Sequence, residues 1–313
     1  MTVWACIGVV LAAANANAEI ADFATFEASQ LRCVVGNNKA WGDHRAGYNG
    51  IFQLVAPNDP ESAFVPLYAG VNLEHYFDTR PRSSDDNVFF EPRRFPMALY
   101  RSSDHSVELH QDPTPVYGVE SWTRFSVSEP YYINVEFRVV PRRTVFQGGV
   151  MGVFWASYIN APENKSMYFL GAGSHLKAPQ WSQLCAQAHG LNSTVCFEGD
   201  VTNIQWPENS TLLYASMSPL RYSTPFFYGR VRNKVLIYMF QPNPYLRFAH
   251  SPSGGGKTPA GDDTNPAWDF QMVIPNYELN KEYKLNLCIV YKDWKGRDDV
   301  IQEVRNYMMK TGN

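Results

Sequence analysis

The sequence predicts an all-β protein: one large antiparallel β-sandwich in a single domain, with a short C-terminal helix. Many segments alternate apolar and polar residues, as half-buried strands do. Clusters of Pro, Gly, Asn and Asp separate these segments, and only two segments have the spacing of a helix. So many strands are expected to pack as two sheets rather than form one open sheet.

Residues 1–18 have the pattern of a secretory signal peptide. An apolar run from Val3 to Ala14 precedes the small-x-small tripeptide at 16–18. The run is too short to cross a bilayer, although no Lys or Arg precedes it and a buried first helix is the alternative. We expect cleavage after Ala18, a mature domain of residues 19–313, and a secreted or periplasmic location.

Three segments carry the clearest strand patterns. Residues 132–139 place Ile133 and Val135 on one face and polar residues on the other, and residues 283–291 alternate again. Residues 234–240 are apolar almost throughout, which predicts a central strand covered on both faces. The other predicted strands are 50–55, 88–90, 98–100, 106–110, 120–127, 150–156, 166–169, 212–216, 246–250 and 270–274.

The two helical segments differ in strength. Residues 298–309 place Val300, Ile301 and Val304 on one face, and Asp298 or Asp299 is suited to cap the first turn. A short helix is also expected within 181–189.

Composition excludes several classes of protein. Hydrophobic residues make up 45% of the chain and charged residues 18%, which excludes a disordered chain or a coiled coil. The net charge of −3 gives no basis for binding nucleic acid. Beyond the signal peptide, no apolar run is long enough to span a membrane.

The mature chain contains four cysteines, Cys33, Cys185, Cys196 and Cys288. An even number in an exported protein is compatible with two disulfides, for example Cys185–Cys196 with Cys33–Cys288. Four buried free thiols are the alternative. Zinc is not expected, because no CxxC spacing occurs.

Several long strings resemble an uncharacterised family of secreted bacterial proteins. They are HRAGYNG at 44–50, NLEHYFD at 72–78, FFEPRRFPM at 89–97, ESWTRF at 120–125, FWASYINAPENKSMYF at 154–169 and HSPSGGG…NPAWDFQ at 250–271. At the level of the fold, the pattern resembles the supersandwich of galactose mutarotases and polysaccharide lyases. The resemblance implies a carbohydrate partner, but the mutarotase catalytic motif is not matched residue by residue and its catalytic pair is not transferred.

Four residues are candidates for acid or base chemistry: His44, Glu74, His75 and His250. Each lies in one of these strings beside glycine or a strand end, and imidazole and carboxylate groups move protons on sugars. In a regular strand Glu74 shares a face with Asp78, and His75 takes the other face. The alternative for each residue is an ordinary structural contact.

Four more residues are candidates for binding the substrate. Arg45 and Arg124 suit a carboxylate or sulfate, and Trp155 and Tyr158 suit the apolar face of a sugar ring. The alternatives are core aromatics and an ion pair of Arg124 with Glu120. All eight candidates are expected to line one concave cleft.

The sequence therefore predicts a secreted carbohydrate-active enzyme: a lyase, hydrolase or epimerase. A non-catalytic glycan-binding or cell-surface structural protein is the alternative. No cofactor and no catalytic metal are expected. A structural Ca²⁺ at the acidic loop 261–263 is the single cation considered.

Overall fold

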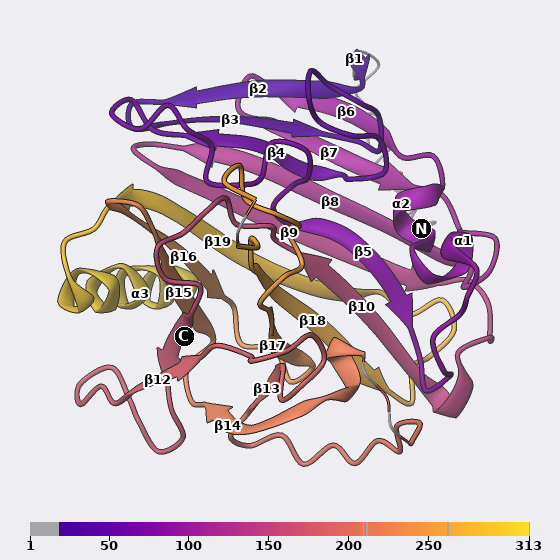
Figure 1. Ribbon diagram of the computed structural model, residues 1–313. Helices are drawn as coiled ribbons and strands as arrows, with labels where there is room; N and C mark the ends of the chain where they lie inside the picture. The colour runs from indigo at the N-terminus through magenta and orange to yellow at the C-terminus, as the bar shows by residue number, and fades with distance from the viewer. Residues whose placement is uncertain (1–18, 209, 211, 262, 313) are drawn as a thin grey trace, which may run out of the picture.

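The computed structural model describes residues 19–208, 210, 212–261 and 263–312. The predicted signal peptide and Asp262 of the acidic loop lie outside the described residues. The described chain forms an all-β sandwich of three sheets with few helical segments, as the sequence predicts (Figure 1).

The first layer is a ten-stranded sheet with the order β1-β6-β7-β8-β9-β19-β16-β15-β11-β12. Its pairings are antiparallel, and its longest ladder joins β8 to β9. Its strands are β1 (Glu19–Ala21), β6 (Ala98–Ser103), β7 (Ser106–Gln111), β8 (Val119–Ser128), β9 (Tyr132–Pro141), β11 (Met167–Leu170), β12 (Trp181–Leu184), β15 (Phe226–Val231), β16 (Lys234–Phe240) and β19 (Tyr283–Asp293).

The second layer is a six-stranded sheet with the order β14-β13-β17-β18-β10-β5. The pairing of β13 with β14 is parallel, and the other pairings are antiparallel. Its strands are β5 (Asn72–Phe77), β10 (Val150–Ala156), β13 (Thr194–Phe197), β14 (Met217–Tyr222), β17 (Leu246–Ser251) and β18 (Ala267–Pro275).

A three-stranded sheet completes the second layer. It consists of β2 (Phe23–Ala28), β3 (Leu31–Gly36) and β4 (Gly50–Val55) and lies over β6, β7 and β8 (Figure 1). Reciprocal backbone hydrogen bonds between Ile51 and Gly70 join β4 to the segment that leads into β5.

The main core lies between the two layers. The inward face of β9 contributes Ile133 and Val135, as the alternation predicts, and the inward face of β18 contributes Phe270. All seven residues of β16 are buried. Their second face is covered by α3 (Arg297–Thr311), which buries Val300, Ile301 and Val304 on the outside of the ten-stranded sheet. No helix among the described residues is long and apolar enough to cross a membrane.

Three predicted elements are corrected by the structure. Residues 88–90 belong to α1 (Asp86–Phe89) and the turn into α2 (Glu91–Arg94), because Asp85 caps the backbone N–H of Asn87 at 2.9 Å. Residues 212–216 contain a 3₁₀ turn, Leu213–Ala215, rather than a strand. Within 181–189, the expected helix is replaced by β12, which pairs with β11.

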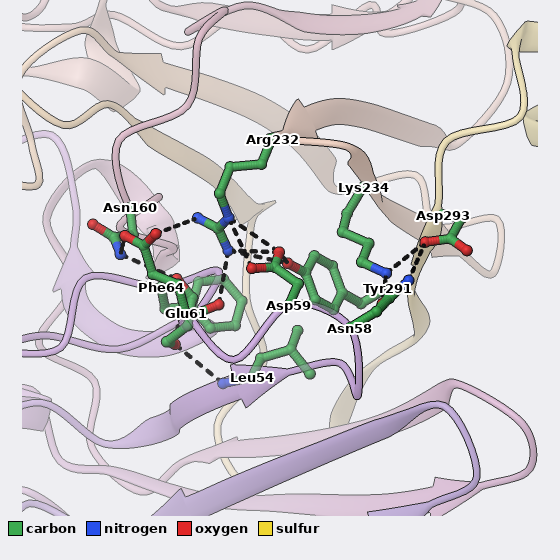
Figure 2. Close-up of polar contacts among 11 residues, drawn as sticks. Leu54, Asn58, Asp59, Glu61, Phe64, Asn160, Arg232, Lys234, Tyr291 and Asp293 are labelled. Carbon is green, nitrogen blue, oxygen red and sulfur yellow. Dashed lines mark hydrogen bonds and ion pairs between the residues drawn. The ribbon is translucent and has the colours of Figure 1, made fainter.

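A buried polar network fastens the loop after β4 to the ten-stranded sheet. The carboxylate of Asp59 accepts hydrogen bonds from Arg232 in the β15–β16 turn and from the hydroxyl of Tyr291 on β19, at 2.9–3.1 Å (Figure 2). Beside it, Lys234 contacts Asp293 at 2.5 Å. Because the charges are paired, the loop buries polar groups without leaving an isolated charge.

All four described cysteines are free thiols, so the disulfide alternative is not realised in the structure. Cys33, Cys196 and Cys288 are buried, whereas Cys185 is exposed. Burial raises the pKa of Cys33 and of Cys288 to about 12. These three buried thiols behave as small apolar side chains.

Candidate functional site

A cavity of about 280 Å³ lies on the outer face of the six-stranded sheet. Its floor comes from β5, β10, β17 and β18, and its walls come from α1, α2 and the segment that contains the 3₁₀ turn 213–215. Its lining residues are Tyr48, Glu74, His75, Arg82, Phe89, Phe90, Arg93, Phe154, Ala156, Tyr158, His189, Leu212, Leu213, Tyr214, Ser251, Gly254, Ala267 and Asp269.

A β-bulge in β5 brings two consecutive polar residues to this cavity. Phe154 of β10 pairs with His75, but the next residue, Trp155, pairs with Leu73, so Glu74 is the extra residue in the ladder. The bulge interrupts the alternation of faces. Glu74 and His75 therefore both line the cavity, and the expectation that they take opposite faces is wrong.

Glu74 is the centre of a hydrogen-bond network on the cavity floor. Its Oε1 lies 2.9 Å from Nε2 of His75, and Oε2 accepts from Asn72 at 3.1 Å and from the hydroxyl of Tyr158. Nδ1 of His75 faces the carbonyl oxygen of Phe89 at 2.6 Å, so both ring nitrogens have partners. The network holds the ring of His75 in one orientation.

The charge of Glu74 is stabilised by its neighbours. Burial by itself raises the pKa of this carboxyl, but His75, Arg93 and the hydrogen bond from Tyr158 outweigh it and lower the pKa to about 2. Burial, and in second place the negative charge of Glu74, raise the pKa of Tyr158 well above its usual range. Glu74 is therefore an anion at neutral pH, and Tyr158 retains its proton.

Arg93 of α2 closes one side of the network. Its guanidinium NH1 lies 3.7 Å from Oε2 of Glu74, and its Nε donates to the carbonyl of Gly47 at 2.5 Å. The guanidinium carbon also lies 3.6 Å from the ring centroid of Tyr48. Glu74 thus balances the positive charge of Arg93, and the Gly47 carbonyl and the Tyr48 ring fix the orientation of its guanidinium.

Asp269 on β18 is a second carboxyl of this cavity, and its state is the opposite of that of Glu74. It is fully buried, its Oδ1 accepts only from the backbone N–H of Ser157 at 3.0 Å, and its Oδ2 has no partner among the described residues. Burial raises its pKa well above the usual range, and the negative charge of Glu74 acts in the same direction. Asp269 is thus favoured as the neutral acid.

His189 lies at the rim of the cavity. Its Nδ1 is 3.0 Å from Oγ of Ser251, and no hydrogen bond to its Nε2 is present among the described residues. Burial lowers the pKa of His189, and the positive charges of Arg82 and His75 add to this effect while Glu74 opposes it. The lowered pKa favours the neutral ring at neutral pH, and Nε2 can accept a proton in the tautomer in which Nδ1 donates to Oγ of Ser251.

Strand register places Ser251, the hydrogen-bond partner of His189, diagonally opposite Asp269. Ser251 pairs with Ala267 across β17 and β18, and Asp269 lies two residues further along the same face. Diagonal neighbours of this kind are separated by about 7–8 Å between Cα atoms. A neutral acid and a neutral base therefore share one small cavity.

Aromatic and apolar side chains form the remaining walls. Tyr214 stacks on Phe77 at 3.9 Å, and the rings of Tyr48 and Tyr68 lie 4.8 Å apart. Such walls suit a ligand that has apolar faces and polar edges. A sugar ring has this character.

The structure brings together three of the eight residues predicted to line one cleft: Glu74, His75 and Tyr158. His44 lies elsewhere, and its two ring nitrogens contact the carbonyls of Tyr48 and Tyr68 at 2.7 and 2.9 Å. Its ring also stacks on Phe52 at 3.5 Å. These contacts tie a loop together.

His250 and Trp155 are excluded from the cavity by strand alternation. Trp155 lies between Phe154 and Ala156, and His250 directly precedes Ser251. These neighbours line the cavity, so Trp155 and His250 point to the opposite face of the sheet. His250 accepts from Ala186 N–H and faces the carbonyl of Lys165 at 2.8 Å, and burial lowers its pKa to about 4. Trp155 packs on Phe270 in the main core.

The two predicted binding arginines also lie outside this cavity. Arg45 is exposed in the loop before β4. Arg124 lies on the outer face of the ten-stranded sheet and contacts Glu108 at 3.3 Å. The expected partner, Glu120, instead contacts Arg142 at 2.7 Å and His110 at 3.1 Å.

Arg82, Arg93, His189 and Asp269 also line this cavity and are not among the eight candidates. The string FFEPRRFPM contains Arg93, and NPAWDFQ contains Asp269. A buried acid in an otherwise apolar strand is a signal that could have identified Asp269. His189 lies in a loop without any pattern, so only its contact with Ser251 reveals it.

Ion-binding groups among the described residues are limited. His110, Asp112 and Glu120 lie close enough to share a cation, although Glu120 is already paired with Arg142. In the acidic loop, Asp263 contacts Lys165 at 2.5 Å. Ca²⁺ binding there stays a prediction.

No protein-family model and no curated protein sequence matches the chain. Solved structures similar to it include a galactose mutarotase-like protein from Lactobacillus casei, with 11% identity, a TM-score of 0.47, and coverage of 86% of this chain and 100% of that one. A galactose mutarotase related enzyme from Lactobacillus acidophilus has 11% identity, a TM-score of 0.46, and coverage of 87% and 97%. A mutant of the heparan sulfate lyase HepC from Pedobacter heparinus has 11% identity, a TM-score of 0.47, and coverage of 91% and 38%.

Proposed function

We propose that the protein binds a single sugar ring in this cavity and catalyses proton transfer at the ring's hemiacetal, interconverting the two anomers. The observation that carries the proposal is the pairing of a neutral acid, Asp269, with a neutral base, His189, in one aromatic-walled cavity. Environments that place two titratable groups in opposite roles are typical of acid–base catalysis.

The size of the cavity favours one sugar ring over a chain. Its volume of about 280 Å³ lies just below the usual range of small-molecule sites, about 300–1,000 Å³. The aromatic walls would cover the faces of the ring, and the polar floor around Glu74 would accept hydrogen bonds from its hydroxyls.

The reaction needs one proton removed and one supplied. Nε2 of His189 would take the proton of the anomeric hydroxyl, and the carboxyl of Asp269 would give its proton to the ring oxygen. The bond between the anomeric carbon and the ring oxygen breaks, and a carbonyl forms at that carbon. Ring closure on the other face reverses both transfers and restores the two groups.

Glu74 has a positioning role in this scheme. A carboxylate whose pKa is about 2 is a weak base at neutral pH, and its oxygens already accept hydrogen bonds from three side chains. It orients His75 and Tyr158 on the cavity floor. The predicted acid–base role of Glu74 and His75 is thereby replaced, in this proposal, by binding and orientation.

The test is the rate of anomer exchange for a panel of free aldoses, followed by NMR exchange spectroscopy. The wild-type protein should accelerate exchange, and D269N and H189N should each lower the rate by about 10²-fold or more. Matched controls are D104N and H105N, which change exposed residues outside the cavity.

Two results would overturn the proposal. One is full activity in both cavity variants. The other is binding of sugars with no acceleration of exchange, which would support the non-catalytic glycan-binding alternative. Circular dichroism and melting temperature establish that each variant is folded.

A further inference from the structure

Most charged side chains at the proposed sugar site have an opposite charge beside them. Glu74 contacts His75 at 2.9 Å and Arg93 at 3.7 Å, and Arg80 contacts Asp78 at 2.7 Å. Arg82 is different: among the residues that the structure describes, it has neither an ion pair nor a hydrogen bond to its guanidinium. Arg82 is exposed, so water solvates its guanidinium, and no acidic side chain of the described residues neutralises this positive charge at the edge of the cavity.

Arg82 lies where two cavities meet. It lines the sugar cavity and also an adjoining cavity of about 180 Å³, and Phe89 and Tyr214 are the other residues common to both. Its guanidinium carbon is 4.3 Å from the ring centroid of Phe89. Stacking on the ring limits the orientation of the guanidinium and leaves its N–H edges open to a ligand.

The adjoining cavity does not repel an anion. Its one carboxylate, Asp78, is held by Arg80 and by the backbone N–H of Gln147 at 2.8 Å. Its other walls are mainly aromatic, including Tyr76, Tyr117 and Tyr214. With Asp269 neutral, the charges that line the two cavities sum in favour of a negative ligand.

We infer that Arg82 forms a subsite for an anionic group, so that the sugar bound in the main cavity carries a carboxylate or phosphate at the end that faces the adjoining cavity. The inference rests on the proposed function and names the class of its substrate. A planar guanidinium binds such groups through paired N–H donors, which gives both affinity and direction.

A bound anion has a consequence for the base. Arg82 and His189 are close enough for the positive charge of Arg82 to lower the pKa of His189. A carboxylate or phosphate on Arg82 would offset that charge, so the pKa of His189 should rise when an acidic sugar binds. The neutral sugar should not produce this rise.

The experiment compares three probes on the full chain: D-glucose, D-glucuronate and D-glucose 6-phosphate. Calorimetry should show at least one acidic sugar binding about tenfold or more tightly than glucose, with an affinity that falls as salt increases. Which acidic sugar is preferred distinguishes a carboxylate from a phosphate. R82Q should bind the acidic and the neutral sugar equally, R82K should keep part of the preference, and the exposed control R32Q should keep all of it.

A second readout is the NMR titration of His189, assigned with H189N. Equal affinity of the wild-type protein for all three probes, or a preference that survives in R82Q, would overturn the inference. If glucose binds and its anomers exchange as fast as those of the acidic sugars, the proposed function stands and the anionic subsite does not. If none of the three sugars binds and none exchanges faster, both proposals fail together.

Discussion

Glu74 and His75 are consecutive residues of β5, yet both side chains line the same cavity and their atoms Oε1 and Nε2 lie 2.9 Å apart. A regular strand would place them on opposite faces of the sheet. The bulge opposite Phe154 and Trp155 removes this restriction. A single irregularity thus creates the close contact between Glu74 and His75 at the centre of the site.

The Glu74 network predicts a particular dependence of stability on pH. The folded pKa of about 2 lies below the value of an unfolded Glu, so ionised Glu74 stabilises the fold above about pH 4. That contribution, about 2–3 kcal/mol, should be lost as the pH falls toward 2. E74Q should be less stable than wild type at pH 7, and the difference should shrink on acidification.

Urea denaturation at a series of pH values measures this effect. E136Q is the matched control, because Glu136 is exposed on β9 and should show no such pH-dependent difference. A difference between E74Q and wild type that stays constant from pH 7 to pH 3 would contradict the network.

His250 should make the protein sensitive to mild acid. Its pKa falls from 6.5 to about 4 because burial disfavours the charged ring. A lowered folded pKa means that stability is complete above about pH 6.5 and is lost as the pH falls toward 4, by about 3 kcal/mol. H250Q should lose less stability than wild type over this window, because only the dependence from the other histidines with lowered pKa values, His44 and His189, remains, whereas H105Q should keep the full wild-type dependence. Equal slopes for H250Q and wild type in melting experiments would show that the buried ring does not titrate in this way.

The Asp59–Arg232 pair should stabilise the loop after β4. D59N removes the charge that Arg232 and Tyr291 contact, and we expect a loss of about 2 kcal/mol, less than for a fully buried pair because Arg232 is partly exposed. E61Q is the control: Glu61 is exposed and 3.9 Å from Arg232, so its loss should be below about 0.5 kcal/mol. Chemical denaturation measures the free energy of unfolding of both variants. Similar losses in D59N and E61Q would show that the contacts of Asp59 do not stabilise this loop.

Thiol reactivity should distinguish the four described cysteines. In the folded protein Cys185 should react rapidly with a thiol reagent, because it is exposed, while Cys33, Cys196 and Cys288 should react only after unfolding. C185S should remove the rapid phase. Peptide mapping after labelling identifies the modified residues, and protection of both Cys185 and Cys196 after unfolding without reductant would indicate a disulfide instead.

Local patterns of sequence were sufficient for most of the fold. Alternation in residues 132–139 and 283–291 predicts two strands, which the structure pairs as β9 and β19, and the apolar run 234–240 predicts the buried strand β16. The C-terminal helix was also predicted. Residues 88–90 and 212–216 are apolar enough for strands, but caps and turns decided their structure, and β12 replaces the helix expected within 181–189. The strands β2, β3, β13, β14 and β15 were among those not predicted.

Candidate residues for the site were predicted less well, because residue type says little about which face of which sheet a side chain occupies. His250 has the chemistry of a catalytic residue. It directly precedes the cavity residue Ser251 in β17, however, so its side chain points away from the cavity. His44 is used to tie a loop. Conversely, His189 has no sequence signal and reaches the site only through a long-range contact.

The sequence by itself determined that the chain is a β-sandwich and where many of its strands lie, because periodicity and turn residues act over a few positions. The tertiary structure alone decided the cavity. It required a bulge that places Glu74 beside His75, a strand register that sets Ser251 diagonal to Asp269, and a loop that carries His189 back to the sheet. Neighbouring groups then separated the two buried carboxyls: His75, Arg93 and Tyr158 keep Glu74 ionised, whereas Asp269 lacks such partners in the described part of the chain and burial favours its neutral form.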